Sequence, residues 1–419
     1  MNILQKLFYI PALLFTMHAA AQEDISYLQT QAVSVNADSL AVSKILGQEF
    51  FSHQLFMVGE IHGIQKGQDI DYTLLTFLNR KFNVKTYIAE VDFAKAYLLN
   101  QYLKTGDERL MDSVFRDWTE QDAQWANTDF KDKIRKIRLY NKSVKPAATI
   151  HFEGIDQIQN PQLVEAYLRN RLIARPGFLQ DAKMLLAALQ AKNDTLIIKE
   201  STELLKQWDR RNVLSVTKNR DADIRFALIN CMQISSAREA QMYKNFKMLY
   251  RSRNWNLEKL YGFFGFAHVL AAKANGGRST SFVYMLSHDT ELNLQGKIAS
   301  IGLLYVDSKM MMPNKGLPAA WRQKGTKFTA IGQYNHDGPL IRLDGIESFK
   351  SATKQGSVTL FDLASAGSPY LMKSLEIKYA DIMPVSQRLL LNAPRAHITD
   401  YLQYAILVRN SAATNPIMQ

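Results

Sequence analysis

The sequence predicts an α/β fold with an open, mainly parallel or mixed central sheet flanked by helices, and with a long helical insertion. Three apolar runs of strand length each end close to an ionisable side chain. A stretch with apolar residues at helical spacing, 70–82, separates the first two runs, and a strand–helix–strand unit favours a parallel pair. Residues 162–254 follow a helical pattern almost throughout. These observations together predict a sheet with a helical cap.

The first 21 residues predict a secretory signal peptide. They contain one basic residue, Lys6, an apolar stretch from Leu7 to Met17 and an Ala19-Ala20-Ala21 end, which is the pattern of a signal with an A-x-A-like cleavage site. The apolar stretch is short for a membrane span, which needs about 20 residues. We therefore expect an exported protein, periplasmic or secreted, in which residues 22–419 form a single domain without a stable membrane span.

Cysteine content and charge exclude several classes of protein. Cys231 is the only cysteine, so an internal disulfide and a cysteine-based zinc site are excluded, and its apolar surroundings predict a buried thiol on a helix. The net charge is +12, and basic residues are densest from Lys131 to Lys145. Apolar residues interleave with them at helical spacing, which favours an amphipathic helix with a solvated basic face over a nucleic-acid site.

Elements before residue 160 follow from the spacing of apolar residues and from turn residues. Helices are expected near 39–46, over 70–82, 93–103 and 108–118 and along 131–145. Strands are expected within 55–63 and over 84–90 and 148–155. Asn160-Pro161 supplies an N-cap followed by proline at the first helical position, so a helix should start there.

After residue 160 the sequence first predicts helices and then mainly strands. The helical insertion, over about 160–254, is broken at Arg175-Pro176-Gly177 and at Asn193-Asp194. Strands are expected over 261–268, which ends in the second histidine, and over 281–286, 297–305, 358–363 and 404–409. A short helix is expected over 269–274, and loops over 309–356.

Two glutamates and two histidines are the candidate catalytic residues of the sequence. The first apolar run ends in Gly59-Glu60-Ile61-His62-Gly63. In an extended segment residues i and i+2 project to the same face, so Glu60 and His62 should point into one cleft. Glu90 ends the second run and His268 ends the third. Because ligands bind at the carboxyl edge of an open α/β sheet, we expect these four side chains to form one active site.

Other catalytic signatures are absent, and two hydrolytic mechanisms fit what remains. The sequence has no G-x-S-x-G elbow, no Walker A loop, no G-x-G-x-x-G and no H-E-x-x-H. In one mechanism His62 is a general base that deprotonates water, a carboxylate orients its imidazole, and His268 polarises a carbonyl or protonates the leaving group. In the other, Glu60, His62, Glu90 and His268 hold a divalent metal that activates the water.

Five short motifs, in a fixed order, carry a resemblance to a known family. They are Gly59-Glu60-Ile61-His62-Gly63, Ala89-Glu90-Val91, Gly154-Ile155-Asp156, the segment from Arg238 to Asn245 with the form R-[DE]-x-x-M-x-x-N, and Gly265-Phe266-Ala267-His268. With these motifs the chain, from about residue 51 to residue 305, resembles the erythromycin esterase-like family. That family lies within a wider group that includes ChaN-like haem-binding lipoproteins and TIKI/TraB-type proteins.

The resemblance implies a hydrolase acting on an ester, lactone or amide bond. It implies that Glu60 and His62 are the water-activating pair, that Glu90 and His268 complete the site, and that Asp156 and Arg238 line or brace it. Two departures argue against macrolides as the substrate. The chain has one residue fewer between glutamate and histidine than the esterases' G-E-x-T-H-G, and it lacks the arginine that follows the histidine in those enzymes.

The wider group implies two alternatives. A ChaN-like protein would bind haem or iron, with His62 or His268 as an axial-type ligand. A TIKI-type protease would bind a divalent metal, because Gly59 to His62 and Gly265 to His268 match its paired G-x-x-H motifs. The leading interpretation requires no cofactor. Its expected partner is a small-molecule substrate rather than nucleic acid, and the sequence indicates no oligomeric state.

Overall fold

The computed structural model describes residues 22–36, 40, 46–212 and 218–417. The predicted signal peptide, residues 1–21, lies outside them, as does most of the helix expected near 39–46. Across the described ranges, no helix combines the length and the apolar character that a membrane crossing requires.

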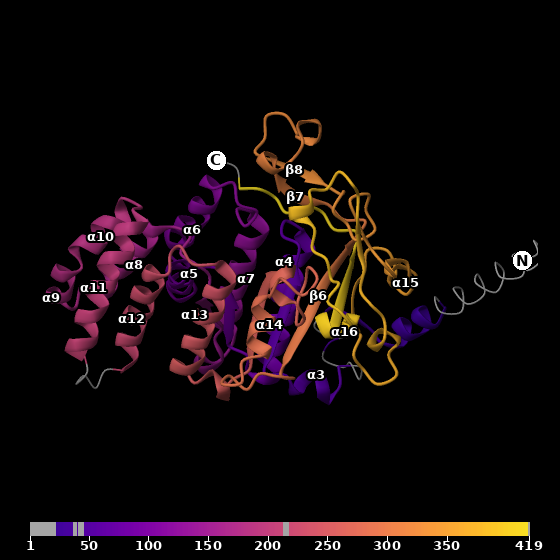
Figure 1. Cartoon of the computed structure of the whole chain (residues 1–419), viewed down its shortest axis with the longest axis horizontal. Helices are drawn as coiled ribbons and strands as arrows, with labels where there is room; N and C mark the ends of the chain where they lie inside the picture. Colours follow the sequence, from indigo (N-terminus) through magenta and orange to yellow (C-terminus); the bar gives the residue numbers. More distant parts are fainter. Residues whose placement is uncertain (1–21, 37–39, 41–45, 213–217, 418–419) are drawn as a thin grey trace, which may run out of the picture.

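An eight-stranded mixed sheet forms the centre of the molecule and confirms the predicted α/β class (Figure 1). Its strands are β1 (Ala32–Ser34), β2 (Leu55–Glu60), β3 (Thr86–Ala89), β4 (His151–Gly154), β5 (Leu260–Gly265), β6 (Ile298–Val306), β10 (Val358–Asp362) and β12 (Tyr404–Arg409). The spatial order is β1-β10-β12-β6-β2-β5-β3-β4. Neighbours from β12 to β4 run parallel, and β1 and β10 complete one edge in antiparallel fashion.

The register of the parallel strands aligns the predicted site segments at one edge. Glu60 at the end of β2 pairs with Gly265 at the end of β5, and Ala89 of β3 pairs with Phe263 of β5 and with Gly154 of β4. All six residues of β2 are buried, as expected for a parallel strand covered on both faces. The carboxyl ends of β2, β5, β3 and β4 therefore meet at the same edge of the sheet.

Two apolar cores lie on the two faces of the sheet. Successive β2 residues alternate between them: Phe56 and Val58 belong to one core, and Leu55 and Met57 to the other. The Phe56 side is covered by α4 (Gln65–Phe82), α5 (Phe93–Thr105), α6 (Glu108–Glu120) and α7 (Thr128–Ser143).

A group of helices separates β4 from β5 and gathers at the left of Figure 1. Its helices are α8 (Pro161–Leu172), α9 (Pro176–Asp181), α10 (Lys183–Gln190), α11 (Asp194–Asn212), α12 (Lys218–Met232) and α13 (Arg238–Ser252). The breaks expected at 175–177 and 193–194 coincide with the starts of α9 and α11. The Asn160 side chain accepts a hydrogen bond from the Gln162 backbone N–H at 2.9 Å, which confirms the predicted cap. The assignment of 22–419 to a single domain stays a prediction.

The remaining elements are short. They are a helical segment over 22–30, α3 (Gln48–Ser52), η1 (Pro146–Ala148), η2 (Trp255–Leu257), η3 (Phe266–Val269), α14 (Phe282–Ser287), β7 (Met310–Pro313), η4 (Asn314–Gly316), η5 (Ala319–Trp321), β8 (Phe328–Ile331), β9 (Ile341–Leu343), α15 (Ile346–Ser351), η6 (Pro369–Leu371), β11 (Ile377–Tyr379), η7 (Val385–Gln387) and α16 (Ile398–Tyr401).

Two local predictions around residues 269–286 are wrong. The strand expected at 281–286 is helix α14, because the Ser281 hydroxyl accepts from the Tyr284 backbone N–H at 2.9 Å and caps a helix. The helix expected at 269–274 is absent, and the 3-10 helix η3 precedes that segment instead. Backbone donors of the segment are used by other parts of the chain: the Ala271 N–H bonds to the Tyr401 carbonyl at 3.0 Å.

Two further expectations are corrected. The segment 309–356, expected as loops, contains β7, β8, β9 and α15; strands of three or four residues are too short to show a period. The basic face of α7 is not wholly solvated, because Lys133 is buried and its Nζ lies 2.5 Å from Asp71 Oδ2. Cys231 is buried as predicted, and burial raises the pKa of its thiol to about 12.

Candidate active site

Glu60 and His62 form a close pair where β2 turns into α4. The Nδ1 atom of His62 lies 2.9 Å from Glu60 Oε1, and the ring of Trp125 lies 4.8 Å from the imidazole, centroid to centroid. Gly63 completes the turn at φ +90°, where a Cβ would also lie 2.5 Å from the Met311 carbonyl oxygen. Only glycine fits this position without strain. The turn therefore fixes the direction in which the imidazole points.

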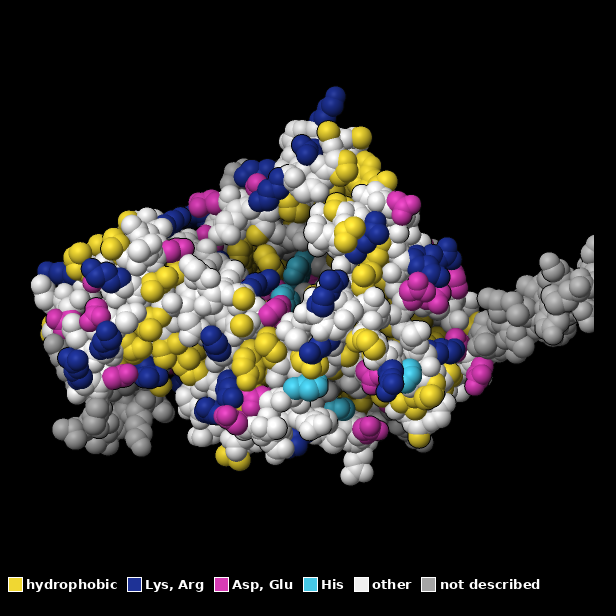
Figure 2. All heavy atoms as spheres, viewed as in Figure 1, with side chains coloured by type: hydrophobic (Ala, Val, Ile, Leu, Met, Phe, Trp, Pro, Cys, Tyr) yellow, Lys and Arg dark blue, Asp and Glu magenta, His cyan; other side chains and the backbone are white. Residues whose placement is uncertain are grey.

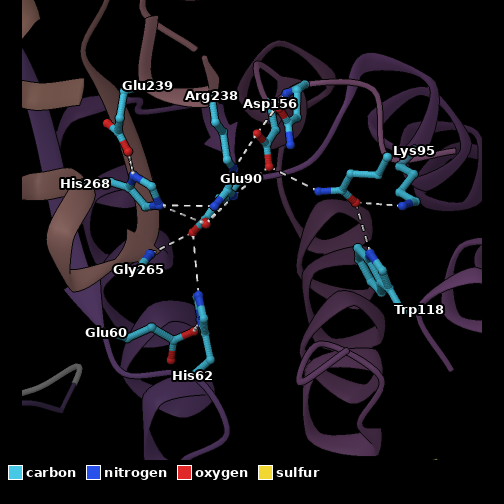
Figure 3. A network of polar contacts seen from close by, with 12 residues as sticks. Glu60, His62, Glu90, Lys95, Trp118, Asp156, Arg238, Glu239, Gly265 and His268 are labelled. Atoms are coloured by element: carbon cyan, nitrogen blue, oxygen red, sulfur yellow. Dashed lines mark hydrogen bonds and ion pairs between the residues drawn. The ribbon is translucent and has the colours of Figure 1, made fainter. Parts of the chain in front are cut away.

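Glu90 is the centre of the polar network in Figure 3. Its Oε1 lies 2.6 Å from Arg238 Nη2 and 3.3 Å from His268 Nε2. Its Oε2 accepts from the Gly265 backbone N–H at 2.7 Å and faces His62 Nε2 at 3.9 Å. Burial raises the pKa of Glu90, but the hydrogen bond from His268 and the charges of His62, His268 and Arg238 outweigh it and hold the pKa well below its ordinary value. Glu90 is therefore a carboxylate.

Arg238 connects the helical insertion to the sheet edge. It is the first residue of α13, and its guanidinium holds Asp156 in a fork, with Nε to Oδ1 at 2.9 Å and Nη2 to Oδ2 at 2.7 Å. Asp156 is 1% exposed. Burial lowers the pKa of Arg238, but its bonds to Asp156 and Glu90 outweigh burial and raise the pKa further. The two buried carboxylates are therefore neutralised in part by a permanently charged group.

His268 lies between two carboxylates. Its Nε2 faces Glu90, and its Nδ1 contacts Oε1 of Glu239 (Figure 3). Burial lowers the pKa of His268, but the hydrogen bonds to Glu239 and Glu90 outweigh it and raise the pKa to about 9. The imidazole is therefore a cation at neutral pH, and its Nε2–H donates to Glu90.

The pKa of His62 depends on a different set of neighbours. Burial lowers its pKa, whereas the hydrogen bond to Glu60 and the charge of Glu90 raise it, and the net shift is upward. Burial raises the pKa of Glu60, and the bond to His62 opposes that rise. When Nδ1–H donates to Glu60, Nε2 carries the lone pair. That nitrogen can accept a proton.

A cleft of ≈ 380 Å³ opens beside these side chains. In Figure 2, histidine side chains lie inside a hollow near the middle of the face shown. The polar floor of the cleft comprises Glu60, His62 and His268. Its walls are mainly apolar or aromatic and include Phe266, Met310, Met312, Tyr334, Ile341, Ile377, Tyr379 and Leu389. The cleft therefore suits a small organic molecule with apolar parts.

The structure brings together the six site residues that the sequence predicted. Glu60, His62, Glu90, His268, Asp156 and Arg238 lie in one network of hydrogen bonds and ion pairs. Sequence reasoning missed three neighbours as site residues. Glu239 follows Arg238 in a quoted motif and could have been found there. Gln124, whose Nε2 donates to the His62 carbonyl at 3.2 Å, and His336, which lines the cleft, gave no recognisable signal.

The site does not fit a divalent metal. Within the described part of the chain, no group of three or more His, Cys, Asp or Glu side chains is arranged to share an ion. Glu60 Oε1 pairs with His62, and both oxygens of Glu90 are used by cationic or N–H donors. The Arg238 guanidinium supplies the positive charge among the carboxylates. Nε2 of His268 is also disfavoured as a haem ligand, because it faces Glu90 while Nδ1 contacts Glu239.

Comparisons with known proteins support the fold. No family model and no curated protein matches the chain. A structural-genomics protein from Bacillus cereus is similar over 95% of this chain and 99% of its own, with a TM-score of 0.72 and 15% identity. A succinoglycan biosynthesis protein has a TM-score of 0.64 and 12% identity, covering 95% of this chain and 99% of its own. An erythromycin esterase mutant, EreC in its open conformation, has a TM-score of 0.60 and 11% identity, covering 93% and 100%. At these identities the likeness establishes a shared fold.

Proposed function

We propose that this chain is a hydrolase of the erythromycin esterase-like type, in which His62 activates water for attack on an ester, lactone or amide. The observation that carries the proposal is the orientation of His62. Glu60 holds Nδ1 at 2.9 Å, so Nε2, beside the cleft, is the nitrogen that is free to take a proton. The similarity of the fold to an erythromycin esterase structure also supports this reaction class, and it does so through the fold alone.

The first step is water attack. A water oxygen forms a bond to the carbonyl carbon while one of its protons passes to His62 Nε2. The imidazolium that results is stabilised by Glu60 at Nδ1 and by Glu90, whose Oε2 lies 3.9 Å from Nε2. A carboxylate on each side of the ring favours the charged form, so the proton transfer costs less than it would in water.

The second step is collapse of the tetrahedral intermediate. His268 is a cationic group that lines the cleft, and its charge is suited to stabilise the negative oxygen. The carbon–oxygen or carbon–nitrogen bond then breaks, and the leaving group takes the proton from His62. An acid and an alcohol or amine are released, and His62 returns to its neutral form.

The proposal also covers the class of substrate and the cellular location. The apolar walls of the cleft favour an ester or lactone with hydrocarbon parts over a fully polar one. We do not extend the proposal to macrolides, because the turn after Glu60 is one residue shorter than in the esterases and lacks their arginine. Export to the periplasm or medium follows from the signal-like pattern of residues 1–21.

The proposal is tested by replacing His62. The substitution His62→Ala should lower kcat for p-nitrophenyl acetate on the order of 1,000-fold, because a general base contributes about 10²- to 10⁴-fold. The matched control is His288→Ala, which removes an exposed histidine at the end of α14 and should leave kcat unchanged. Both proteins should unfold at the same temperature as the wild type within a few degrees.

Two outcomes would overturn the proposal. One is hydrolysis in His62→Ala at the rate of the wild type. The other is stoichiometric metal or a haem absorbance band in protein purified without chelator and lost in His62→Ala, which would replace the metal-independent base with one of the two alternatives.

A further inference from the structure

A second, small cavity lies directly behind one wall of the cleft. Its volume is ≈ 30 Å³, and its mainly apolar lining includes Leu304, Leu363, Leu402 and Ala405, which are at most 4% exposed. The polar members of the lining are His336, Asp344 and Tyr370. A buried water needs two to four polar partners, and a cavity lined in this way offers few. The mainly apolar lining therefore favours an apolar occupant.

The cavity and the cleft share a wall of three residues. Phe266, His336 and Ile377 line both of them. Phe266 belongs to η3 and stands two residues before His268, so the wall begins beside the proposed reaction centre. His336 is 4% exposed, and its Nδ1 accepts from the Tyr305 backbone N–H at 2.9 Å. Burial lowers the pKa of His336 to about 4, so the shared wall is uncharged at neutral pH.

We propose that this cavity receives the end of a linear hydrocarbon chain carried by the ester substrate, entering from the cleft past Phe266 and Ile377. The proposal rests on the hydrolase function above and names its substrate class as esters with an unbranched apolar chain. Ile377 lies on β11, a three-residue strand paired only with β9. A change in the side-chain rotamers of Phe266 and Ile377 joins the two spaces.

The size of the cavity sets the expected selectivity. One water-sized group requires about 10–15 Å³ of such volume, so ≈ 30 Å³ accommodates about two methylene groups. Burying each methylene favours binding by about fourfold. Filling the cavity should therefore raise kcat/KM by about 15-fold over that of an ester whose chain ends in the cleft.

The test compares two alanine-to-valine substitutions. Ala405 of β12 is 1% exposed and lines the cavity, so Ala405→Val occupies the space with two added methyl groups. The control is Ala299→Val on β6, which is equally buried but belongs to the core on the opposite face of the sheet. Ile377→Ala is a third variant, which widens the shared wall. Thermal unfolding of each variant confirms that it is folded.

Two substrate series cover both sides of the ester bond. They are p-nitrophenyl alkanoates from acetate to octanoate and alkyl acetates from ethyl to octyl. In the wild type, kcat/KM should rise with chain length in one series. Ala405→Val should remove about 15-fold of that preference, Ala299→Val should retain it, and Ile377→Ala should extend it to longer chains. Equal kcat/KM along both series, or an equal preference in Ala405→Val and the wild type, would overturn the inference.

Binding separates the failure of this inference from the failure of the hydrolase proposal. Titration calorimetry with butanol, hexanol and octanol needs no turnover. Octanol should bind the wild type more tightly than butanol does, and Ala405→Val should lose that difference. If acetate esters are hydrolysed in a His62-dependent way but neither chain length nor alcohol length matters, the cavity proposal alone fails. If the alcohols bind as expected but no ester is hydrolysed, the hydrolase proposal fails, and with it the ester as the carrier of the chain.

Discussion

The floor and the facing wall of the cleft hold histidines of opposite character. On the floor, His268 is 12% exposed and lies between Glu90 and Glu239, and its pKa is raised to about 9. On the wall, His336 is 4% exposed and its Nδ1 accepts from the Tyr305 backbone N–H, and burial lowers its pKa to about 4. Both imidazoles are shielded from water.

The difference shows that carboxylates, and not burial, decide which histidine is charged. Burial disfavours the charged form of both, but two anions beside His268 reverse the outcome. Pairs of groups whose environments push their pKa values apart are typical of acid–base sites. In the proposed reaction the floor of the cleft is the reactive surface, and the wall offers a neutral surface to the apolar part of a ligand.

The largest expected effect comes from removing the carboxylate that orients His62. Glu60→Gln should lower kcat for acetate esters on the order of 1,000-fold, because an amide can stabilise the wrong tautomer of the imidazole. The control is Glu165→Gln, which alters another buried carboxylate, on α8, and should leave kcat unchanged. Steady-state kinetics on both variants would sharpen the contrast between floor and wall. A Glu60→Gln enzyme with wild-type kcat would show that Glu60 does not orient the base.

The next effect concerns stability. Arg238→Met leaves the buried carboxylate of Asp156 without its cation and Glu90 with only its histidine partners. The free energy of unfolding should therefore fall by about 3 kcal/mol. Arg251→Met on the same helix removes only an exposed pair with Glu291, so it should change stability by less than about 1 kcal/mol. Urea unfolding of both variants at neutral pH provides the comparison. Equal losses would mean that the buried network does not hold the sheet edge together.

A smaller effect is expected at His268 itself. Glu239→Gln should lower the pKa of His268 from about 9 toward the ordinary histidine value, because it removes an adjacent negative charge. His336 is the internal control, and its pKa should stay near 4. Titration of the imidazole resonances by NMR measures both groups in one sample. If the substitution leaves the pKa of His268 unchanged, Glu239 does not raise that pKa, and the upward shift is due to Glu90 alone.

The sequence predicts more of the polar site than of the cleft around it. Glutamates and histidines that follow strand-like runs can be recognised in the sequence. Because parallel strands align their carboxyl ends, Glu60, Glu90 and His268 could be predicted to lie together. Glu239 reaches His268 from a helix that is distant in sequence from β2 and β3. The motif around Arg238 could have pointed to Glu239, but its contact with His268 depends on where the start of α13 lies relative to η3, which the motif does not encode.

The wall of the cleft was beyond prediction for a different reason. The strands β7, β8, β9 and β11 have three or four residues each, so they show no measurable alternation. α14 contains residues that favour strands, yet the Ser281 cap and the burial of Phe282, Val283 and Leu286 make it a helix. Tertiary packing overrides local preference in such short segments.

The pH dependence of kcat/KM tests the central claim most directly. His62 must be neutral to accept a proton, so the rate should rise with pH through its pKa, which lies above the ordinary value of 6.5. His268 must stay protonated, so the rate should fall as pH passes about 9. The expected profile is bell-shaped. In Glu90→Gln both limbs should move to lower pH, because the negative charge that raises the pKa of both His62 and His268 is lost. A rate that keeps rising above the pKa of His268, with the same profile in Glu90→Gln, would contradict the central claim.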